Sequence, residues 1–303
     1  MATATQMTAP EKRPSGTSEG GGRIGIVAGG GALPVAIVST LLREGADPYV
    51  VTIDGETADD PALAACDTIR FRVEELGLLL PAVRKAGVRR LVFAGHIGRR
   101  PRLRRIRWTW PLLKAAPRLA TALASGDDRL LRTLVSIAEE NGIEIVGAHQ
   151  IVPSLLTPEG VLTRRGPVGS DRRDIEAASQ AAALIGRLDM GQGAIAIGGR
   201  AVALEGIEGT DGLLERTAAM RDHGRLAGKK RGVLVKRCKP QQELRVDLPA
   251  IGPDTVTGAL AAGLAGIAVE AGRTFILDFE RTIALADEHG LFVLGLKQEG
   301  EAP

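Results

Sequence analysis

Acidic and basic side chains gather in two short runs in the second half of the chain. The runs "EGIEGTDG" and "KRCKPQQELRVDLPAIG" hold these charged residues: Glu205, Glu208, Asp211, Lys236, Arg237, Lys239, Glu243, Arg245 and Asp247. Carboxylates at the ends of strands and helices can collect a divalent ion, and neighbouring Lys or Arg can hold phosphate oxygens. The residue types therefore predict phosphoryl chemistry in this half.

Each acid also has a structural interpretation. Asp127, in the separate run "SGDDRLLR", can cap the helix that follows it, and Glu208 or Asp211 can cap the helix of "DGLLER". The segment "RVDLPAIG" is expected to be extended. Because residues two apart on an extended segment point the same way, Arg245 and Asp247 would share one face. A salt bridge between these two residues is the competing interpretation.

A glycine-rich turn, "VAGGGALP", lies between the first predicted strand and a helix. Such a turn presents free backbone amides and the positive end of a helix dipole to an anion. Gly29 and Gly31 match the first two glycines of the dinucleotide fingerprint, and Asp54 stands where its acid belongs, but Pro34 occupies the third glycine position. Nicotinamide binding, binding of another anion and a purely structural turn all remain open.

A basic arm follows in "GHIGRRPRLRRIRWTWPLLKAAPRL", where arginines from Arg99 to Arg107 adjoin Trp108 and Trp110. Cations beside tryptophans suit an anionic membrane surface or, with base stacking, nucleic acid. A solvated arginine face is the plain alternative. Nucleic acid is disfavoured, because no recognisable RNA-binding or DNA-binding fold signature accompanies the arm.

The elements that would position these residues form two α/β blocks. Residues 23–152 alternate strand-like runs such as "RIGIVA" and "RLVFAG" with helical periods, which predicts a Rossmann-like, mostly parallel sheet. A Pro- and Gly-rich linker is expected over 153–170, and a second, less regular α/β domain over 171–303. Residues 1–22 are polar and aperiodic and are expected to form a disordered tail.

Composition narrows the chemistry further. Cys66 and Cys238 lie far apart and the four histidines are scattered, so a metal would be held mainly by oxygens, which favours magnesium or manganese. There is no signal-like apolar segment and no apolar run long enough to span a bilayer, so a cytoplasmic protein is expected.

Many ordered motifs together resemble the LpxI family of UDP-2,3-diacylglucosamine pyrophosphatases. The resemblance runs from about Arg23 to Gly295 and rests on these segments: "IGIVAGGGALP", "VFAGHIGR", "GDDRLLR", "EIVGAHQ", "IGRLDMGQGAIAI", "VALEGIEGTDGLLER", "GVLVK", "KPQQELRVDLPAIGPDTV", "AGLAGIAVEAG" and "GLFVLGL". One departure is the run Arg99-Arg100-Pro101 with further arginines, where the family usually has a single Arg-Pro.

The resemblance implies an enzyme with a lipid-sugar site in the cleft between two α/β domains. It would use magnesium, or manganese, to hydrolyse UDP-2,3-diacylglucosamine to 2,3-diacylglucosamine 1-phosphate (lipid X) and UMP in lipid A biosynthesis. Its expected partners are this substrate and product, the cytoplasmic face of the inner membrane and a second copy of the chain, with no nucleic acid. A Rossmann-type nucleotide-dependent oxidoreductase is the alternative, and a non-catalytic lipid or RNA binder a third.

The family's essential aspartate corresponds to Asp247, either as metal ligand or as general base. Position within the matching motifs adds Asp211 and Glu243 as catalytic candidates, and Asp211 with Asp247 as metal ligands. The substrate-binding candidates are Gly29, Gly30, Gly31, Ala32, His96, Thr210, Lys236 and Arg245. On this resemblance the glycine turn approaches the substrate's phosphate or sugar, and the basic arm is a candidate acyl-chain entrance or membrane contact.

Overall fold

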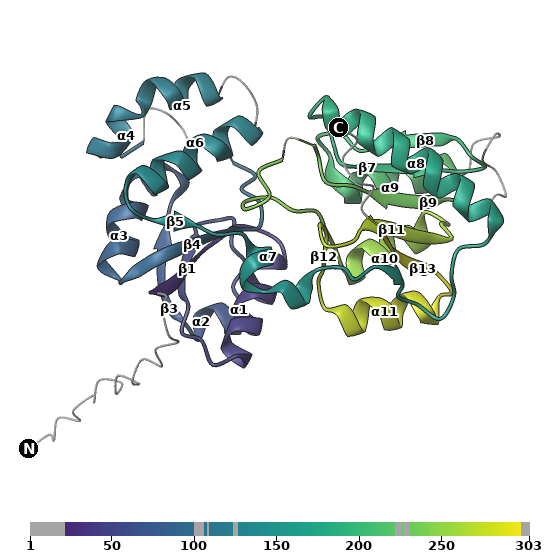
Figure 1. Ribbon diagram of the computed structural model, residues 1–303, viewed down its shortest axis with the longest axis horizontal. Helices are drawn as coiled ribbons and strands as arrows, with labels where there is room; N and C mark the ends of the chain where they lie inside the picture. Colours follow the sequence, from purple (N-terminus) through teal and green to yellow (C-terminus); the bar gives the residue numbers. More distant parts are fainter. Residues whose placement is uncertain are drawn as a thin grey trace, which may run out of the picture.

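The computed structural model describes residues 22–99, 106, 107, 109–123, 127–221, 226, 231–240 and 242–297. Within these residues the chain forms two α/β domains, which lie side by side with β12 (Phe275–Ile276) between them (Figure 1). No helix in the described ranges combines the length and the apolar character that crossing a bilayer requires.

The first domain is built on a parallel sheet with five strands in the described residues, in the order β3-β2-β1-β4-β5. Its strands are β1 (Arg23–Ala28), β2 (Tyr49–Ile53), β3 (Asp67–Phe71), β4 (Val88–Ala94) and β5 (Glu144–Ile145). Its helices are α1 (Leu33–Arg43), α2 (Pro61–Ala64), η1 (Val73–Leu78), α3 (Leu79–Lys85), α4 (Trp110–Lys114), α5 (Ala116–Leu123), α6 (Asp127–Glu140) and α7 (Ala148–Ile151). The predicted Rossmann-like sheet is confirmed.

Alternate residues of the first sheet fill two separate cores. Ile26 of β1 packs with Ile37 of α1 on one face, whereas Val27 packs with Val135 of α6 on the other. The chain leaves β1 and β4 toward opposite faces, so the order of the strands reverses between these neighbours. In open α/β sheets this point, at the carboxyl edge, is where ligands bind.

The second domain is built on a mixed sheet with the order β6-β13-β11-β9-β7-β8. Its strands are β6 (Gly160–Val161), β7 (Gly193–Ala196), β8 (Ala201–Leu204), β9 (Val233–Lys236), β11 (Gly266–Glu270) and β13 (Phe292–Leu296). Its helices are α8 (Gly169–Arg187), α9 (Gly209–Met220), α10 (Pro253–Ala261) and α11 (Phe279–Glu288). Strands β9, β11 and β13 are parallel, and α8 packs on the face opposite to α9 and α10. Strands β7 and β8 form an antiparallel hairpin, with Gly198 and Gly199 at φ +66° and +77° between them.

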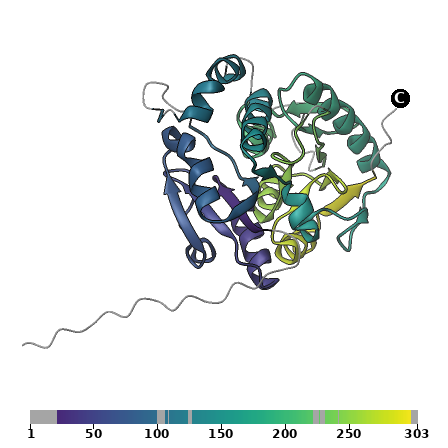
Figure 2. The same ribbon diagram turned by 60° about the vertical axis from the view of Figure 1, so that its left-hand side comes forward.

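Two short segments near the junction of the domains differ in what they join. Strand β6, inside the predicted linker, pairs antiparallel with β13 and so belongs to the second sheet. A small parallel pair, β10 (Ala250–Ile251) and β12 (Phe275–Ile276), contributes Phe275 to the core that contains α1. Figure 2 shows the two domains side by side. The boundaries drawn from the sequence at 152 and 171 stay predictions.

Candidate active site

The glycine turn after β1 packs directly on the loop after β4. The Gly30 N–H donates to the His96 carbonyl at 2.7 Å, and the His96 N–H donates back to Gly30 at 3.1 Å. A Cβ on Gly29 would lie 2.5 Å from the His96 carbonyl oxygen, and a Cβ on Gly95, at φ +80°, would lie 2.3 Å from the Gly30 oxygen. Only glycine fits such an approach. The predicted residues Gly29 to Gly31 and His96 therefore meet at the carboxyl edge of the first sheet.

Two other predicted features complete this turn. Ala32 precedes the first residue of α1, and Pro34 is buried in the first helical turn, where its missing N–H has no cost. Asp54 lies after β2, and its carbonyl accepts a 2.6 Å hydrogen bond from Arg99 Nη2. The first arginine of the basic arm is thus fixed to the same edge.

Glu56 is a buried acid at this edge that sequence reasoning missed. Its side chain is 8% exposed, and it accepts hydrogen bonds from the Gly98 and Arg99 amides at 2.9 and 3.1 Å. Burial alone would raise the pKa of Glu56, but the hydrogen bonds from Gly98 and Arg99 outweigh it and lower the pKa. No motif marks Glu56, because it stands in an ordinary turn and its partners are more than forty residues away.

Lys236 is the centre of the charged cluster at the carboxyl edge of the second sheet. It ends β9, is 4% exposed, and its Nζ donates to the Ala250 carbonyl at 3.0 Å. Burial lowers the pKa of Lys236, and the nearby carboxylates of Glu205, Asp247 and Asp211 counter that shift. Lys236, Asp211 and Asp247, predicted from three separate segments, therefore lie in one electrostatic neighbourhood, and Glu205 of the same charged runs, which was not a candidate catalytic or binding residue, joins them.

Glu205, whose charge acts on the pKa of Lys236, is held by Thr210 and by the backbone before β7. Thr210 Oγ1 donates to Glu205 Oε1 at 3.0 Å, and the Gln192 amide donates to Oε2 at 3.1 Å. A Cβ on Gly193 would lie 2.7 Å from the same Oε2. Thr210 therefore orients the buried carboxylate, while Asp211, in the first turn of α9, is exposed.

The segment that carries Asp247 is a turn, so the predicted extended conformation is wrong. The amides of Val246 and Asp247 both donate to the Glu243 carbonyl, at 2.9 and 3.1 Å. Arg245 therefore points away from Asp247 and binds Glu243 through two hydrogen bonds, of 2.9 and 3.0 Å. The local ion pair stabilises the turn, and its hydrogen bonds lower the pKa of Glu243. Asp247 Oδ2 instead accepts from Gln242 Nε2 at 2.6 Å.

This turn lies between the carboxyl edges of both sheets. Leu244 and Leu248 pack in the core that contains α1, and a Cβ on Gly147, just after β5, would lie 3.2 Å from the Arg245 Cα. The charge of Asp247, in turn, raises the pKa of Lys236 at the end of β9 against the effect of burial. The light green segment between the two domains in Figure 1 follows this path. The glycine turn and the charged cluster thus border one region of the molecule.

The donor set suits a hard cation in type but is small. Asp211 and Asp247 offer exposed carboxylate oxygens beside the same lysine. No group of three or more His, Cys, Asp or Glu side chains within the described residues is arranged to hold a metal. Magnesium commonly takes one or two carboxylates, with waters and substrate phosphates as its other ligands, so the two aspartates fit it. The predicted magnesium or manganese stays a prediction.

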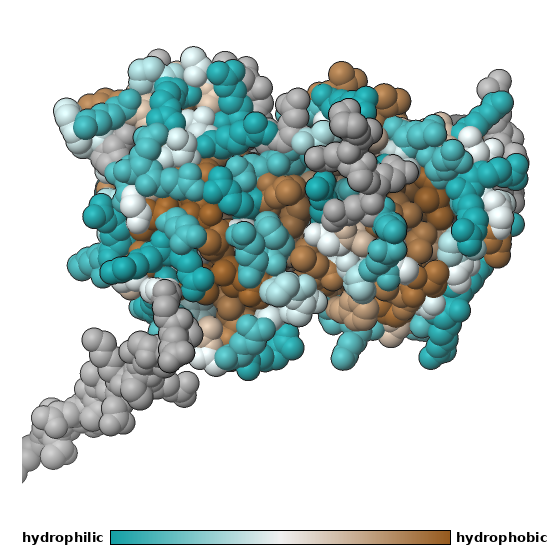
Figure 3. Space-filling view, viewed as in Figure 1, coloured by the Kyte–Doolittle hydropathy of each residue, from teal (hydrophilic) through white to brown (hydrophobic). Residues whose placement is uncertain are grey.

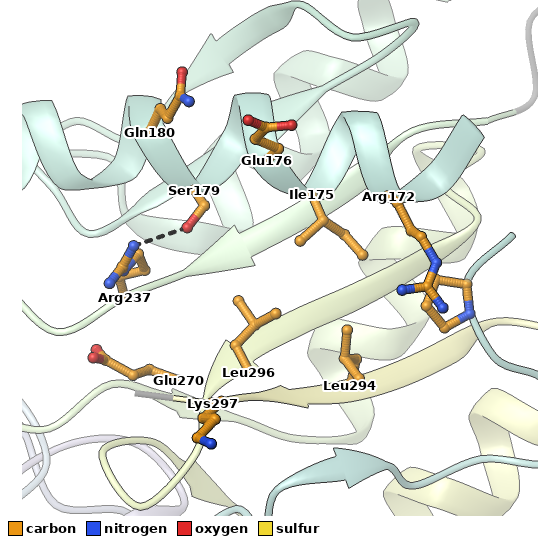
Figure 4. A pocket seen from close by; sticks show the side chains of 11 residues that line it. Arg172, Ile175, Glu176, Ser179, Gln180, Arg237, Glu270, Leu294, Leu296 and Lys297 are labelled. Carbon is orange, nitrogen blue, oxygen red and sulfur yellow. Dashed lines mark hydrogen bonds between the residues drawn. The ribbon is translucent and has the colours of Figure 1, made fainter. Parts of the chain in front are cut away.

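A separate pocket of about 390 Å³ lies on the other face of the second sheet (Figure 4). Ile175 and Leu294 contribute to its apolar side, and Arg237 Nη1 donates to Ser179 Oγ at 3.0 Å across it. Consecutive strand residues point to opposite faces, and Val235 packs on the α8 side whereas Leu234 packs on the α9 side. Lys236 therefore points away from this pocket.

Most of the basic arm lies outside the described residues, including Arg100, Arg102, Arg104, Arg105 and Trp108. The side chains of Asp127 and Asp128 also lie outside them. Trp110 on α4 is described and is 68% exposed, and Lys114 Nζ lies 5.5 Å from the centre of its ring.

Fold and site define a two-domain α/β protein in which two sheet edges meet at a lysine and several carboxylates. The model of the LpxI N-terminal domain matches residues 23–155, and that of the LpxI C-terminal domain matches residues 158–294. The chain is 40% identical over 275 residues to the UDP-2,3-diacylglucosamine pyrophosphatase LpxI of Caulobacter vibrioides, covering 90% of this chain and 97% of that protein. The chain belongs to the LpxI family.

Among solved structures, a crystal structure of isoflavone reductase is 12% identical and covers 92% of this chain and 79% of that one, with a TM-score of 0.27. A TM-score this low carries no argument about fold or function. Neither that likeness nor the glycine turn alone supports the oxidoreductase alternative, because the family match accounts for the turn together with the rest of the chain.

Proposed function

We propose that this protein hydrolyses the pyrophosphate of UDP-2,3-diacylglucosamine to 2,3-diacylglucosamine 1-phosphate (lipid X) and UMP, in lipid A biosynthesis. The observation that carries the proposal is the 40% identity to the LpxI pyrophosphatase along 97% of that protein's length. The charged cluster around Lys236 supports it independently, because hydrolysis of an anionic pyrophosphate needs a cation to balance the phosphate charge and carboxylates to activate water.

The reaction is the attack of water on one phosphorus of the anhydride. The water oxygen forms a bond to phosphorus, the bridging P–O bond breaks, and UMP and lipid X separate. Gln242 holds Oδ2 of Asp247, which leaves Oδ1 to accept the proton of the attacking water. The Lys236 ammonium balances the negative charge that the phosphates bring beside Asp211 and Asp247.

Asp211 would hold the divalent metal, as magnesium or manganese, and Asp247 would be its second ligand in the alternative to accepting the proton of the water. When bound, such an ion neutralises phosphate charge and lowers the pKa of a coordinated water. Both Glu205 oxygens accept hydrogen bonds, from Thr210 and Gln192, and the charge of this carboxylate favours the ammonium form of Lys236. Glu243 and Arg245 bind each other, so we assign them to the support of the turn rather than to contact with substrate.

The substrate would lie between the domains. The turn from Gly29 to Gly31, with Ala32 and the first amides of α1, would receive phosphate or sugar oxygens, and the exposed His96 side chain borders that turn. The Asp247 turn, packed on the same sheet edge, would then bring the reacting groups to the anhydride.

An amphiphilic substrate requires access from a membrane, and we propose peripheral contact with the cytoplasmic face of the inner membrane. Trp110 and Leu113 on α4 are 68% and 52% exposed, and Leu188 and Met190 at the end of α8 are 70% and 57% exposed. Figure 3 shows hydrophobic atoms on the upper side of both domains. A homodimer also stays a prediction.

Co-sedimentation with vesicles of phosphatidylethanolamine and phosphatidylglycerol tests the membrane contact. Replacing Trp110 and Leu113 with Ser is expected to reduce the bound fraction. Phe279→Ser, which removes an exposed apolar side chain from α11, serves as the matched control. An equal bound fraction in all three proteins would contradict the contact.

Release of UMP from UDP-2,3-diacylglucosamine in detergent micelles tests the reaction. We expect turnover with magnesium, no turnover with a chelator, and recovery when magnesium or manganese is returned. Asp247→Ala is expected to be inactive, whereas Asp254→Ala, which removes an exposed acid from α10, is expected to be active. A wild-type protein without turnover in either metal would overturn the proposed function.

A further inference from the structure

The turn that carries Asp247 is held by side chains of the first domain. Arg245 Nη1 donates to Glu139 Oε1, near the end of α6, at 2.6 Å. The His149 ring, on α7, lies beside the same turn, since a Cβ on Gly147 would lie 2.3 Å from His149 Cε1 and 3.2 Å from the Arg245 Cα, and the Leu244 backbone raises the pKa of the ring against the effect of burial. Both contacts cross from the N-terminal domain to the few residues that precede Asp247.

Apolar contacts and polar contacts have different tasks at this junction. Leu244 and Leu248 pack in the same core as Ala148 and Val152, and Val246 packs against the core on the other face of the first sheet. Apolar packing is non-directional, whereas a hydrogen bond weakens steeply when it is misaligned. The leucines and the valine therefore keep the turn on the domain, and the polar contacts determine its orientation.

A continuous set of contacts leads from Glu139 to Asp247. Glu139 holds Arg245, and Arg245 holds both oxygens of the Glu243 carboxylate. The Glu243 carbonyl then accepts the Asp247 amide at 3.1 Å. A rotation of the guanidinium would therefore move the backbone that carries the Asp247 side chain.

We infer that Glu139 and His149 are positioning residues for Asp247, which hold its turn so that the carboxylate stays beside Lys236 and Asp211. The inference rests on the proposed function, because it takes Asp247 to act in the reaction. Neither Glu139 nor His149 would contact the reacting atoms, and their effect would pass through Arg245 and Leu244.

Four substitutions test the inference, and the chain offers a matched control. Glu139→Gln and His149→Leu remove the two contacts. His149→Gln and His149→Asn keep a side-chain N–H donor at two different reaches. The control is Glu140→Gln, because Glu140 follows Glu139 on α6 but pairs with Arg118 at 2.7 Å.

The kinetic readout is the split between kcat and KM. We expect kcat to fall about threefold in Glu139→Gln, because partly exposed ion pairs contribute little, and about tenfold in His149→Leu, with KM unchanged. One of the two amide variants at His149 is expected to recover most of kcat. An equal loss of kcat in Glu140→Gln, or a loss confined to KM, would overturn the positioning role.

Amide hydrogen exchange of residues 244–248 gives a readout that needs no substrate. In Glu139→Gln and His149→Leu these amides are expected to exchange at least about threefold faster, at an unchanged thermal midpoint, and in Glu140→Gln at the wild-type rate. Unchanged exchange in all variants would overturn the inference. If the wild-type protein released no UMP, faster exchange would still establish the anchoring, so the two failures are distinguishable.

Discussion

The carboxyl edges of the two sheets present different kinds of surface. At the edge of the first sheet, backbone meets backbone, since Gly30 and His96 exchange two hydrogen bonds and Gly95 packs on Gly30. At the edge of the second sheet, charged side chains gather, since the buried Lys236 ammonium feels the charges of the Glu205, Asp211 and Asp247 carboxylates. One edge depends on the absence of side chains and the other on their charge.

The contrast teaches how the two edges divide the work of a site. Backbone amides are fixed donors whose charge does not change, so they suit the binding of an anionic group. Carboxylates and amines can exchange protons and accept metals, so they suit the chemical step. Added atoms should therefore disturb the first edge, whereas removed charges should disturb the second.

The sharpest test of the comparison is Asp247→Asn, which keeps the size of the side chain and removes its charge. We expect kcat to fall by about a thousandfold, within the range typical of a lost general acid or base. The measurement is UMP release under saturating substrate. A rise in KM with kcat unchanged would assign Asp247 to substrate binding and remove the distinction between the edges.

Lys236→Met should act on stability as well as on activity. Removal of the ammonium would leave the Ala250 carbonyl without its 3.0 Å hydrogen bond and the buried Glu205 without a nearby cation, at a cost of about 1–3 kcal/mol. Urea unfolding measures this loss, and kcat measures the accompanying loss of activity. An equally stable variant would mean that the carboxylates do not need the lysine.

Gly95→Ala should disturb the first edge through shape alone. Its Cβ would lie 2.3 Å from the Gly30 oxygen at a φ of +80°, so the two loops must separate, at a cost of about 1–3 kcal/mol. We expect KM to rise while kcat changes little. Gly45→Ala is the control, because Gly45 has a φ of +78° with nothing within 4 Å of the added Cβ. Equal effects of the two substitutions would show that only backbone strain was measured.

The smallest effect concerns Cys238, which follows the second edge. Burial, with the charge of Glu270, raises its pKa from 9.0 to about 12. As the pH rises above 9.0, the unfolded thiol ionises first, so this group's contribution to stability is lost between pH 9.0 and about 12. The free energy of unfolding, measured across this pH range, should fall less steeply for Cys238→Ala than for the wild-type protein. Identical slopes would show that the thiol is open to solvent.

Sequence reasoning found the regular parts of this molecule because their patterns are local. The runs "RIGIVA" and "RLVFAG" became the strands β1 and β4. Strand β3, "DTIRF", was missed because it is an edge strand with mostly exposed side chains, and so lacks a clear apolar pattern. Strand β6 was missed because two residues become a strand only when β13 pairs with them.

The candidate site was found in part, for similar reasons. Lys236, Asp211 and Asp247 stand in charged runs, so their chemistry was visible before their proximity was known. The predicted orientation of Arg245 was wrong because its guanidinium binds Glu243 and Glu139 instead of Asp247, and Glu139 is distant in sequence. Glu56 carries no local signal, since its side chain is covered by the loop after β4, which is more than forty residues away in the sequence.

The pairing of β6 with β13 has a consequence for the order in which a ribosome-bound chain can fold. The first sheet is complete at Ile145, so its surface exists while the second domain is still being synthesised. The turn of Asp247 then emerges beside a first sheet whose strands are already complete, but Thr163 must wait for Val293, 130 residues later, to receive its partner amide. Translation would therefore complete the sheet that carries the glycine turn early, and the sheet that carries Lys236 only when β13 is made.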